Sequence, residues 1–120
     1  MATIYRQELI RRYKEGERDF SRVKLEVDLS GIDLSGADLT GSRMDEFYFE
    51  RAIMRSVSFV NAQLAQSCLD GADLTGADFR GARLSYAKLR GANLTNADLR
   101  GARFSNTSFD RANLSGANLS

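Results

Sequence analysis

The sequence contains no histidine and a single cysteine, Cys68, which excludes many catalytic and metal-binding arrangements. Without histidine there is no histidine-activated nucleophile, no cysteine–histidine pair and no conventional zinc ligand set. One cysteine also cannot form a disulfide bond within the chain. We therefore expect a protein that is not an enzyme and that binds neither a metal nor a cofactor.

Long hydrophobic runs are also missing. No stretch approaches the roughly 20 apolar residues that a membrane-spanning helix needs. The N-terminal residues mix apolar side chains with Arg6, Glu8, Arg11 and Arg12, unlike the apolar core of a secretory signal. Together with the single cysteine, this composition favours a reducing cytoplasm and no membrane partner.

The chain has no excess of one charge. It carries 17 Lys and Arg residues against 16 Asp and Glu residues, a formal net charge of +1. A nucleic-acid binder needs a general positive field, and a mimic of nucleic acid needs a negative one. We therefore expect no direct nucleic-acid binding, and an unidentified protein as the partner.

What the sequence does contain is a large apolar residue at every fifth position, nineteen times in succession from Leu29 to Leu119. A helix would spread this set around its circumference, and a strand would alternate it between two faces. The residue two places earlier is Ala in twelve of the nineteen units and points to the same side of the chain. The chain must therefore turn a corner every five residues, which predicts a solenoid.

A longer period gives the number of units in one coil. Residues 71–85 share eleven of fifteen identities with residues 91–105, whereas shifts of 5, 10 and 15 positions give seven, eight and six. A repeat of twenty residues makes four sides per coil. Successive coils would stack at the inter-strand spacing of about 4.8 Å. We therefore expect an all-β, four-sided parallel solenoid with a filled centre.

The motif Ala-(Asp/Asn)-Leu-x-Gly, seen in residues 37–41 and 72–76, resembles the pentapeptide-repeat family over about four fifths of the chain. The resemblance implies a right-handed quadrilateral β-helix, here of about five coils. It also implies a non-enzymatic scaffold or protein-interaction module, which is the favoured hypothesis.

The alternative function is a DNA-mimicking inhibitor or protector of DNA gyrase, which the resemblance to the quinolone-resistance branch of the family implies. Such a mimic needs a continuous negative field. From Glu26 onward the chain has twelve acidic and ten basic residues, a net charge of only −2. The chain also lacks the large loops that some gyrase-directed members carry.

The residues before the repeats predict a helix over 4–15, with Thr3 as its N-cap and Gly16 as its stop. We expect residues 1–17 to form an N-terminal capping helix and residues 18–120 to form the β-helix. Such a helix would cover the apolar core and unpaired strand groups of the first coil. The alternative is a basic recruitment helix built on Arg6, Arg11, Arg12 and Lys14.

Two irregularities interrupt the repeat. The step from Leu25 to Leu29 is four residues, which predicts a one-residue slip in register near Glu26. Further on, five consecutive turn positions lack glycine and predict a change of corner type; they are Glu46, Arg51, Ser56, Asn61 and Gln66.

The same irregular stretch places apolar side chains at outward positions. These residues are Tyr48, Ile53 and Val60, and Phe47 replaces the usual Ala. The stretch either repacks locally or presents an apolar patch to a partner or a second copy.

Stacking residue n on residue n+20 brings charged side chains together at one corner. Around Gly81 and Gly101 the stacking clusters Arg80, Arg83, Arg100 and Arg103, with Asp78 and Asp98 beside them. The cluster is either a ladder of surface ion pairs, each contributing little, or a candidate interaction surface for an anion or acidic partner.

Cys68 is expected to face outward beside Lys88. A lone thiol is usually incidental; the alternative is that the Lys88 ammonium lowers the thiol pKa enough for oxidation.

The C-terminal coil would expose Phe104, Phe109, Leu114 and Leu119. An uncovered solenoid end predicts an end-to-end homodimer, with a truncated chain or a weakly protected monomer as alternatives.

Overall fold

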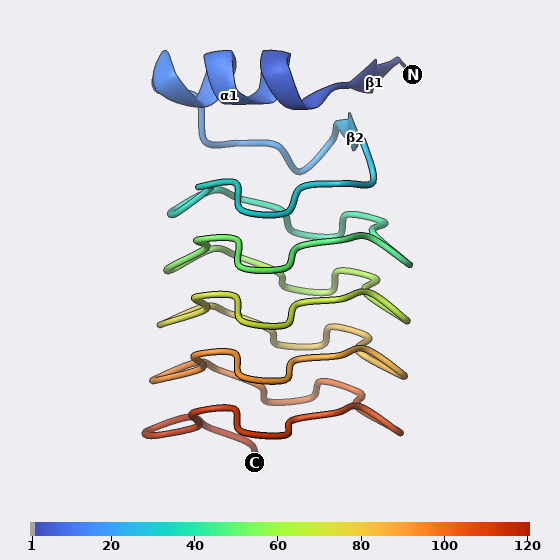
Figure 1. Cartoon of the computed structure of the whole chain (residues 1–120), viewed down its shortest axis with the longest axis vertical. Coiled ribbons are helices and arrows are strands. Elements are labelled where there is room, and N and C mark those ends of the chain that lie inside the picture. The colour runs from blue at the N-terminus through green and yellow to red at the C-terminus, as the bar shows by residue number, and fades with distance from the viewer. Residues whose placement is uncertain (1) are drawn as a thin grey trace.

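The computed structural model describes residues 2–120 and contains three short regular elements near its N-terminus. They are strand β1 (Thr3–Ile4), helix α1 (Arg6–Lys14) and strand β2 (Lys24–Leu25). The remaining described chain runs in flat coils that stack on one another, with α1 at one end of the stack and the C-terminus at the other (Figure 1). The molecule measures 34 × 22 × 20 Å along its principal axes.

Main-chain hydrogen bonds hold each coil to the next in a register of twenty residues. Isolated parallel bridges join residues twenty positions apart, from Asp28 with Tyr48 to Asp98 with Asn118. The Cys68 N–H donates to the Phe47 carbonyl at 2.9 Å, and the Cys68 carbonyl accepts from the Phe49 N–H at 2.7 Å. The predicted twenty-residue coil is confirmed.

The bridges fall into four vertical columns, each named after one member. The Cys68 column contains residues 28, 48, 68, 88 and 108; the Asp73 column 33, 53, 73, 93 and 113; the Asp78 column 38, 58, 78, 98 and 118; and the Arg83 column 43, 63, 83 and 103. The chain visits the columns in this order in every coil. The Asp78 and Arg83 columns are therefore neighbours, separated by a corner.

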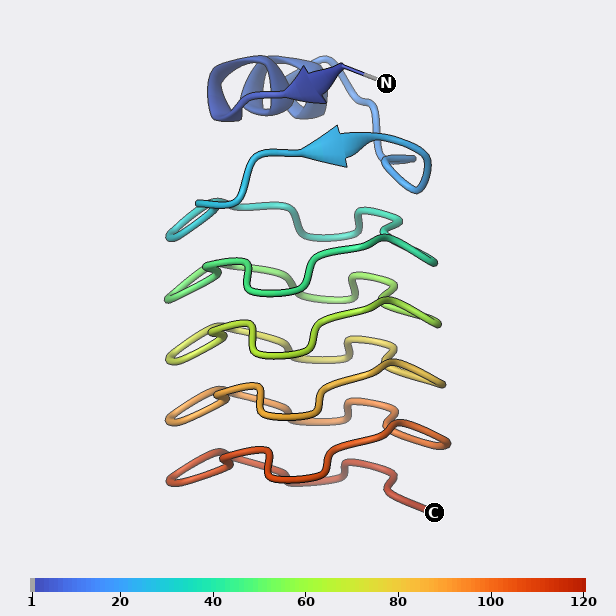
Figure 2. The same ribbon diagram turned by 90° about the vertical axis from the view of Figure 1, so that its right-hand side faces the viewer.

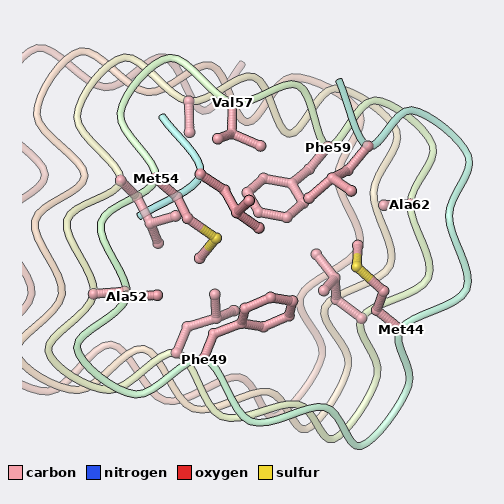
Figure 3. Close-up of a cluster of buried hydrophobic side chains, with 14 of the residues drawn as sticks. Met44, Phe49, Ala52, Met54, Val57, Phe59 and Ala62 are labelled. Atoms are coloured by element: carbon pink, nitrogen blue, oxygen red, sulfur yellow. The ribbon is translucent and has the colours of Figure 1, made fainter. Parts of the chain in front are cut away.

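The core is built from the residues that recur every five positions. All of them from Leu29 to Leu99 are buried. Side chains of successive faces point from different sides into one centre (Figure 3); they include Met44, Phe49, Met54 and Phe59. The rings of Phe59 and Phe79, which belong to successive coils, stack with centroids 4.8 Å apart. Such pairs contribute about 0.5–1.5 kcal/mol beyond the burial of their area.

The corner residues all have positive φ, whether or not they are glycine. The corner glycines of the repeats have φ between 67° and 78°, and the residues from Glu46 to Gln66 have φ between 57° and 62°. The predicted change of corner type in this stretch was wrong. The hydrogen bonds between coils impose the left-handed backbone, and a side chain there costs about 1–2 kcal/mol.

The N-terminal helix is shorter than predicted and begins differently. Thr3 does not cap α1, because Thr3 and Ile4 pair in parallel with Lys24 and Leu25 as β1 and β2 (Figure 2). Tyr5 occupies the N-cap position without a side-chain hydrogen bond. Glu26 instead accepts a hydrogen bond from the Arg6 N–H. Met1, part of the predicted segment 1–17, lies outside the described residues.

The register slip near Glu26 is confirmed. Asp19 pairs with Asp38, nineteen residues away, whereas the pairing from Asp28 onward spans twenty. The pairing is therefore one residue shorter before Asp28 than after it, as the four-residue step from Leu25 to Leu29 predicts.

We predict that replacing a corner side chain by glycine stabilises the protein. Ser56 is exposed with φ 59°, and its hydroxyl makes no hydrogen bond to a described residue. Ser56→Gly should raise the free energy of unfolding by about 1 kcal/mol, because glycine adopts this backbone without strain. Urea denaturation checks the value.

Two matched variants test the cause. Ser56→Ala keeps the Cβ and should bring no gain. Gly91→Ala introduces a Cβ into open space at φ +68° and should lower stability by about 1–2 kcal/mol. Equal stability of Ser56→Gly and Ser56→Ala would contradict the explanation.

Candidate interaction surface

The fold brings the predicted charged residues together in stacked pairs. Asp78 pairs with Asp98 in one column, and Arg83 pairs with Arg103 in the next. Arg80 and Arg100 follow the two aspartates by two residues, so they lie beside the same column. The corner between the columns contains Gly81 and Gly101, which carry no side chain. We call these four arginines and two aspartates the arginine corner.

Two of the four arginines are neutralised locally. The Arg80 guanidinium donates to the Asp78 carboxylate at 2.7 and 2.9 Å, and its main-chain N–H donates to the same carboxylate at 3.1 Å. Arg100 makes the same set of contacts with Asp98. The Asp-x-Arg spacing thus forms a turn and an ion pair together.

These contacts shift the ionisation of the four groups. Hydrogen bonding from Arg100 lowers the pKa of Asp98 to about 2, against an opposing effect of burial. Hydrogen bonding from Arg80 likewise lowers the pKa of Asp78. The carboxylates in turn raise the pKa of Arg80 and of Arg100. Both aspartates are therefore charged, and each offsets one arginine.

Arg83 and Arg103 are different because they form no ion pair with any residue from 2 to 120. Both side chains are exposed and lie in adjacent coils of the Arg83 column. The residues that follow each of them on this side are Ser85 and Ser105, which carry no charge. The uncompensated positive charge of the arginine corner is therefore confined to the Arg83 column.

An aromatic side chain that the sequence pattern did not single out lies at the edge of this surface. Tyr86 occupies the next corner of the same coil, is 59% exposed and has φ 63°. An aromatic residue where the repeat usually has glycine or asparagine was the available signal.

The predicted apolar residues do not form one patch. Tyr48 lies in the Cys68 column, Ile53 in the Asp73 column, and Val60 two residues beyond Ser58 in the Asp78 column. Tyr48 and Ile53 are 50% and 42% exposed, whereas Val60 is partly buried. The three side chains are thus distributed over three sides of the coil.

Cys68 is not the exposed, activated thiol that the stacking beside Lys88 suggested. Lys88 does pair with Cys68 in the column, but the cysteine is partly buried. Burial raises the pKa of the Cys68 thiol, and the negative charges of Asp70 and Glu50 raise it further. The alternative of a thiol activated by Lys88 was wrong, because burial and two carboxylates shift the pKa of Cys68 in the opposite direction.

The last coil is less buried than the coils before it. Phe104, Phe109 and Leu114 are partly buried and pack against the core, and Leu119 is 51% exposed. The rings of Phe104 and Phe109 meet edge to face, with centroids 5.9 Å apart. The end-to-end dimer stays a prediction.

The described residues lack two other kinds of feature. Among residues 2–120, no group of three or more His, Cys, Asp or Glu side chains is placed to hold a metal ion. Within the same residues, no helix has the length and apolar character needed to cross a membrane.

Comparison with known families identifies the repeat. A family model described as pentapeptide repeats matches in eight copies, over residues 19–59, 32–69, 58–96 and 87–120. The chain therefore belongs to the pentapeptide-repeat family. Membership implies the right-handed quadrilateral β-helix that the sequence motif suggested. No curated protein matches the chain.

Solved structures similar to the chain are also pentapeptide repeat proteins. A protein of the cyanobacterium Cyanothece 51142 is 30% identical with a TM-score of 0.77, over 78% of this chain and 65% of its own. One from the Arabidopsis thaliana thylakoid lumen is 43% identical with a TM-score of 0.41; the match covers 72% of this chain and 64% of that protein. One from Nostoc PCC 7120 is 31% identical with a TM-score of 0.46, over 100% of both chains. The chain thus spans less than two thirds of the first two.

We predict that Asp98 titrates about two pH units below an ordinary aspartate, whose pKa is about 3.9. Because its folded pKa lies below its unfolded pKa, Asp98 stabilises the fold above about pH 4, and this contribution is lost as the pH falls toward 2. Arg100→Ala should raise the pKa of Asp98 toward the ordinary value. Carboxyl ¹³C NMR measures both pKa values. Arg83→Ala is the control and should leave Asp98 unchanged; an unaltered pKa in Arg100→Ala would refute the assignment.

We predict that Cys68 reacts with iodoacetamide with a pH midpoint above the ordinary thiol pKa of about 8.5. Asp70→Asn should move the midpoint down, because it removes a negative charge near the thiolate. Lys88→Ala should leave it in place. A midpoint below 8.5 in the unmodified protein, checked by mass spectrometry of the alkylated chain, would show that an activating cation dominates.

Proposed function

We propose that the protein is a non-enzymatic interaction module that presents the Arg83 column to an acidic segment of a protein partner. The observation that carries the proposal is the pairing of Arg83 with Arg103 in adjacent coils, because neither arginine has a carboxylate partner among residues 2–120. Membership of the pentapeptide-repeat family supports the repeat architecture of the module. The acidic character of the proposed partner is inferred from the unpaired positive charges of this chain.

The geometry suits carboxylates spaced along an extended chain. Arg83 and Arg103 bridge directly, so their side chains leave the surface one inter-strand spacing apart, about 4.8 Å. Their backbone is fixed to the preceding coil, because the Arg83 N–H donates to the Ala62 carbonyl and the Arg83 carbonyl accepts from the Leu64 N–H. Planar guanidinium groups on a rigid support can bind carboxylates in a bidentate manner with little loss of backbone entropy.

Arg80 and Arg100 define the edge of this surface and contribute little net charge. Each already binds an aspartate, so a partner carboxylate would have to compete with an ion pair. The Asn61 side chain of the preceding coil lies over Gly81, whereas only Gly81 backbone lies near Gly101. A partner segment can therefore approach the Arg83 column closely on the Gly101 side of this corner.

The alternative, a DNA-mimicking protein that acts on gyrase, is opposed by the same charges. A mimic must present continuous negative potential. In this chain Asp78 and Asp98 are neutralised by Arg80 and Arg100, and the adjoining Arg83 column is positive. An acidic partner is the class that this surface favours.

We also propose that α1 caps the first coil. Leu9 is fully buried, and Ile10 and Tyr13 pack against the core. The Tyr13 hydroxyl donates to the Ser35 carbonyl at 2.7 Å, which fixes the helix to the coil below it.

For the location of the protein we propose the cytoplasm, a proposal supported by the single cysteine.

We predict that Arg83→Glu/Arg103→Glu abolishes capture of one specific protein from extracts of the native cell, because it reverses both unpaired charges. Its recovery by quantitative mass spectrometry should fall at least about tenfold. With the purified partner, binding to the unmodified chain should weaken as salt rises, since the charges are exposed.

The control is Arg51→Glu/Arg111→Glu, which reverses two other arginines that form no ion pair with a described residue. This variant has the same net charge as the test variant and should retain the partner. Equal loss with both variants would mean that capture follows overall charge, and the proposed surface would be wrong.

A further inference from the structure

A cleft opens in the side of the molecule between the first coil and the second. Its volume is about 500 Å³, and it is lined by residues 21–24 on one wall and residues 41–43 on the other. This volume lies within the range of sites that bind small molecules, about 300–1,000 Å³. The cleft is at the N-terminal end of the Arg83 column, two coils away from Arg83 itself.

The cleft exists because the hydrogen bonds between coils are interrupted there. In the next coil, the Gln63 N–H donates to the Ser42 carbonyl at 2.9 Å, and the Gln63 carbonyl accepts from the Met44 N–H at 2.7 Å. Arg43 occupies the equivalent position one coil earlier, yet neither its N–H nor its carbonyl has a backbone partner in the described chain. Strand β2 pairs with β1 on its opposite edge instead.

The direction of the unpaired groups follows from the repeat. At this position in every later coil, the N–H and carbonyl point toward the preceding coil, as the bonds of Gln63, Arg83 and Arg103 show. Arg43 therefore directs a free N–H donor and a free carbonyl toward the wall formed by residues 21–24. The one-residue slip at Glu26 accompanies this break in the ladder.

The charge of the lining is entirely positive. Arg22, Lys24 and Arg43 line the cleft, all three are exposed, and none forms an ion pair with a described residue. No carboxylate belongs to the lining. The nearest acidic residues in sequence lie outside the lining. Asp19 accepts from the N–H and the hydroxyl of Ser21 at the edge of the cleft. Glu26 accepts from the Arg6 N–H, and Asp45 accepts from the Ala65 N–H at 2.9 Å in the following coil.

The lining also contains an unsatisfied hydroxyl and an apolar wall. Ser42 is 7% exposed, and its Oγ is the one buried side-chain polar atom of residues 2–120 without a hydrogen-bond partner. At the equivalent inward position, the Ser67 hydroxyl donates to the Leu64 carbonyl at 2.6 Å. Val23, which is partly buried, supplies apolar surface on the opposite wall.

We propose that this cleft binds a small organic anion, in which a carboxylate or phosphate group is attached to a short apolar chain. The anionic group would be held by Arg22, Lys24 and Arg43, whose main-chain N–H is an additional donor for it. The apolar chain would lie on Val23 and on the methylene stems of the basic side chains. This site includes Arg43 of the Arg83 column but neither Arg83 nor Arg103, which carry the proposed function, so either proposal can fail alone.

The test is a titration of the ¹⁵N-labelled full chain followed by amide NMR, with four probes: hexanoate, hexyl phosphate, hexanamide and inorganic phosphate. We expect hexanoate or hexyl phosphate to shift the amide signals of residues 21–24 and 41–43 in a saturable manner. The better of the two should bind at least about tenfold more tightly than hexanamide or inorganic phosphate. The preference between the two anions then identifies the head group.

Matched variants locate the binding. Arg43→Ala and Lys24→Ala should each weaken binding at least about fivefold, whereas Lys88→Ala, which removes an exposed cation in the Cys68 column, should not. Unchanged amide spectra away from the substituted residue will show that each variant is folded. Equal binding of hexanamide, equal binding of inorganic phosphate, an equal loss with Lys88→Ala, or no saturable shift up to about 10 mM would each overturn the proposal.

Discussion

Each coil after the first is joined to its neighbours by main-chain hydrogen bonds in a register of twenty residues, and the other features of the protein depend on this register. It aligns the side chains in vertical columns, so that Phe59 stacks on Phe79 inside and Arg83 lies against Arg103 outside. It also imposes positive φ at every corner. The left-handed backbone at Glu46 and Arg51 shows that the hydrogen bonds between coils outweigh the local preference of the side chain.

The two proposed surfaces come from opposite states of this ladder. The N–H and carbonyl groups of Arg83 and Arg103 are all hydrogen-bonded, and the unsatisfied feature there is the positive charge of the two side chains. At Arg43 the ladder is interrupted, and the unsatisfied groups include a main-chain donor, a main-chain acceptor and the hydroxyl of Ser42. The first surface is flat and suits an extended chain. The second is concave and suits a small molecule.

Much of the fold was predictable because the repeat is long and regular. The five-residue spacing gave the inward positions, the identity at twenty residues gave the coil, and the short step before Leu29 gave the slip. The errors fell where a distant contact overrides a local signal. Thr3 has the side chain of an N-cap, but its backbone pairs with Lys24, more than twenty residues away, and Glu26 serves the first N–H of the helix instead.

By itself, the sequence determined the solenoid, its core and the clustering of charge at one corner, because these follow from residue type and a constant period. Only the tertiary structure decided which charges are neutralised. Asp78 and Asp98 bind the arginines two residues later, and this leaves Arg83 and Arg103 unpaired. The structure alone also revealed the cleft beside Arg43, because a missing hydrogen bond between coils depends on where the first strand pairs, which no local pattern records.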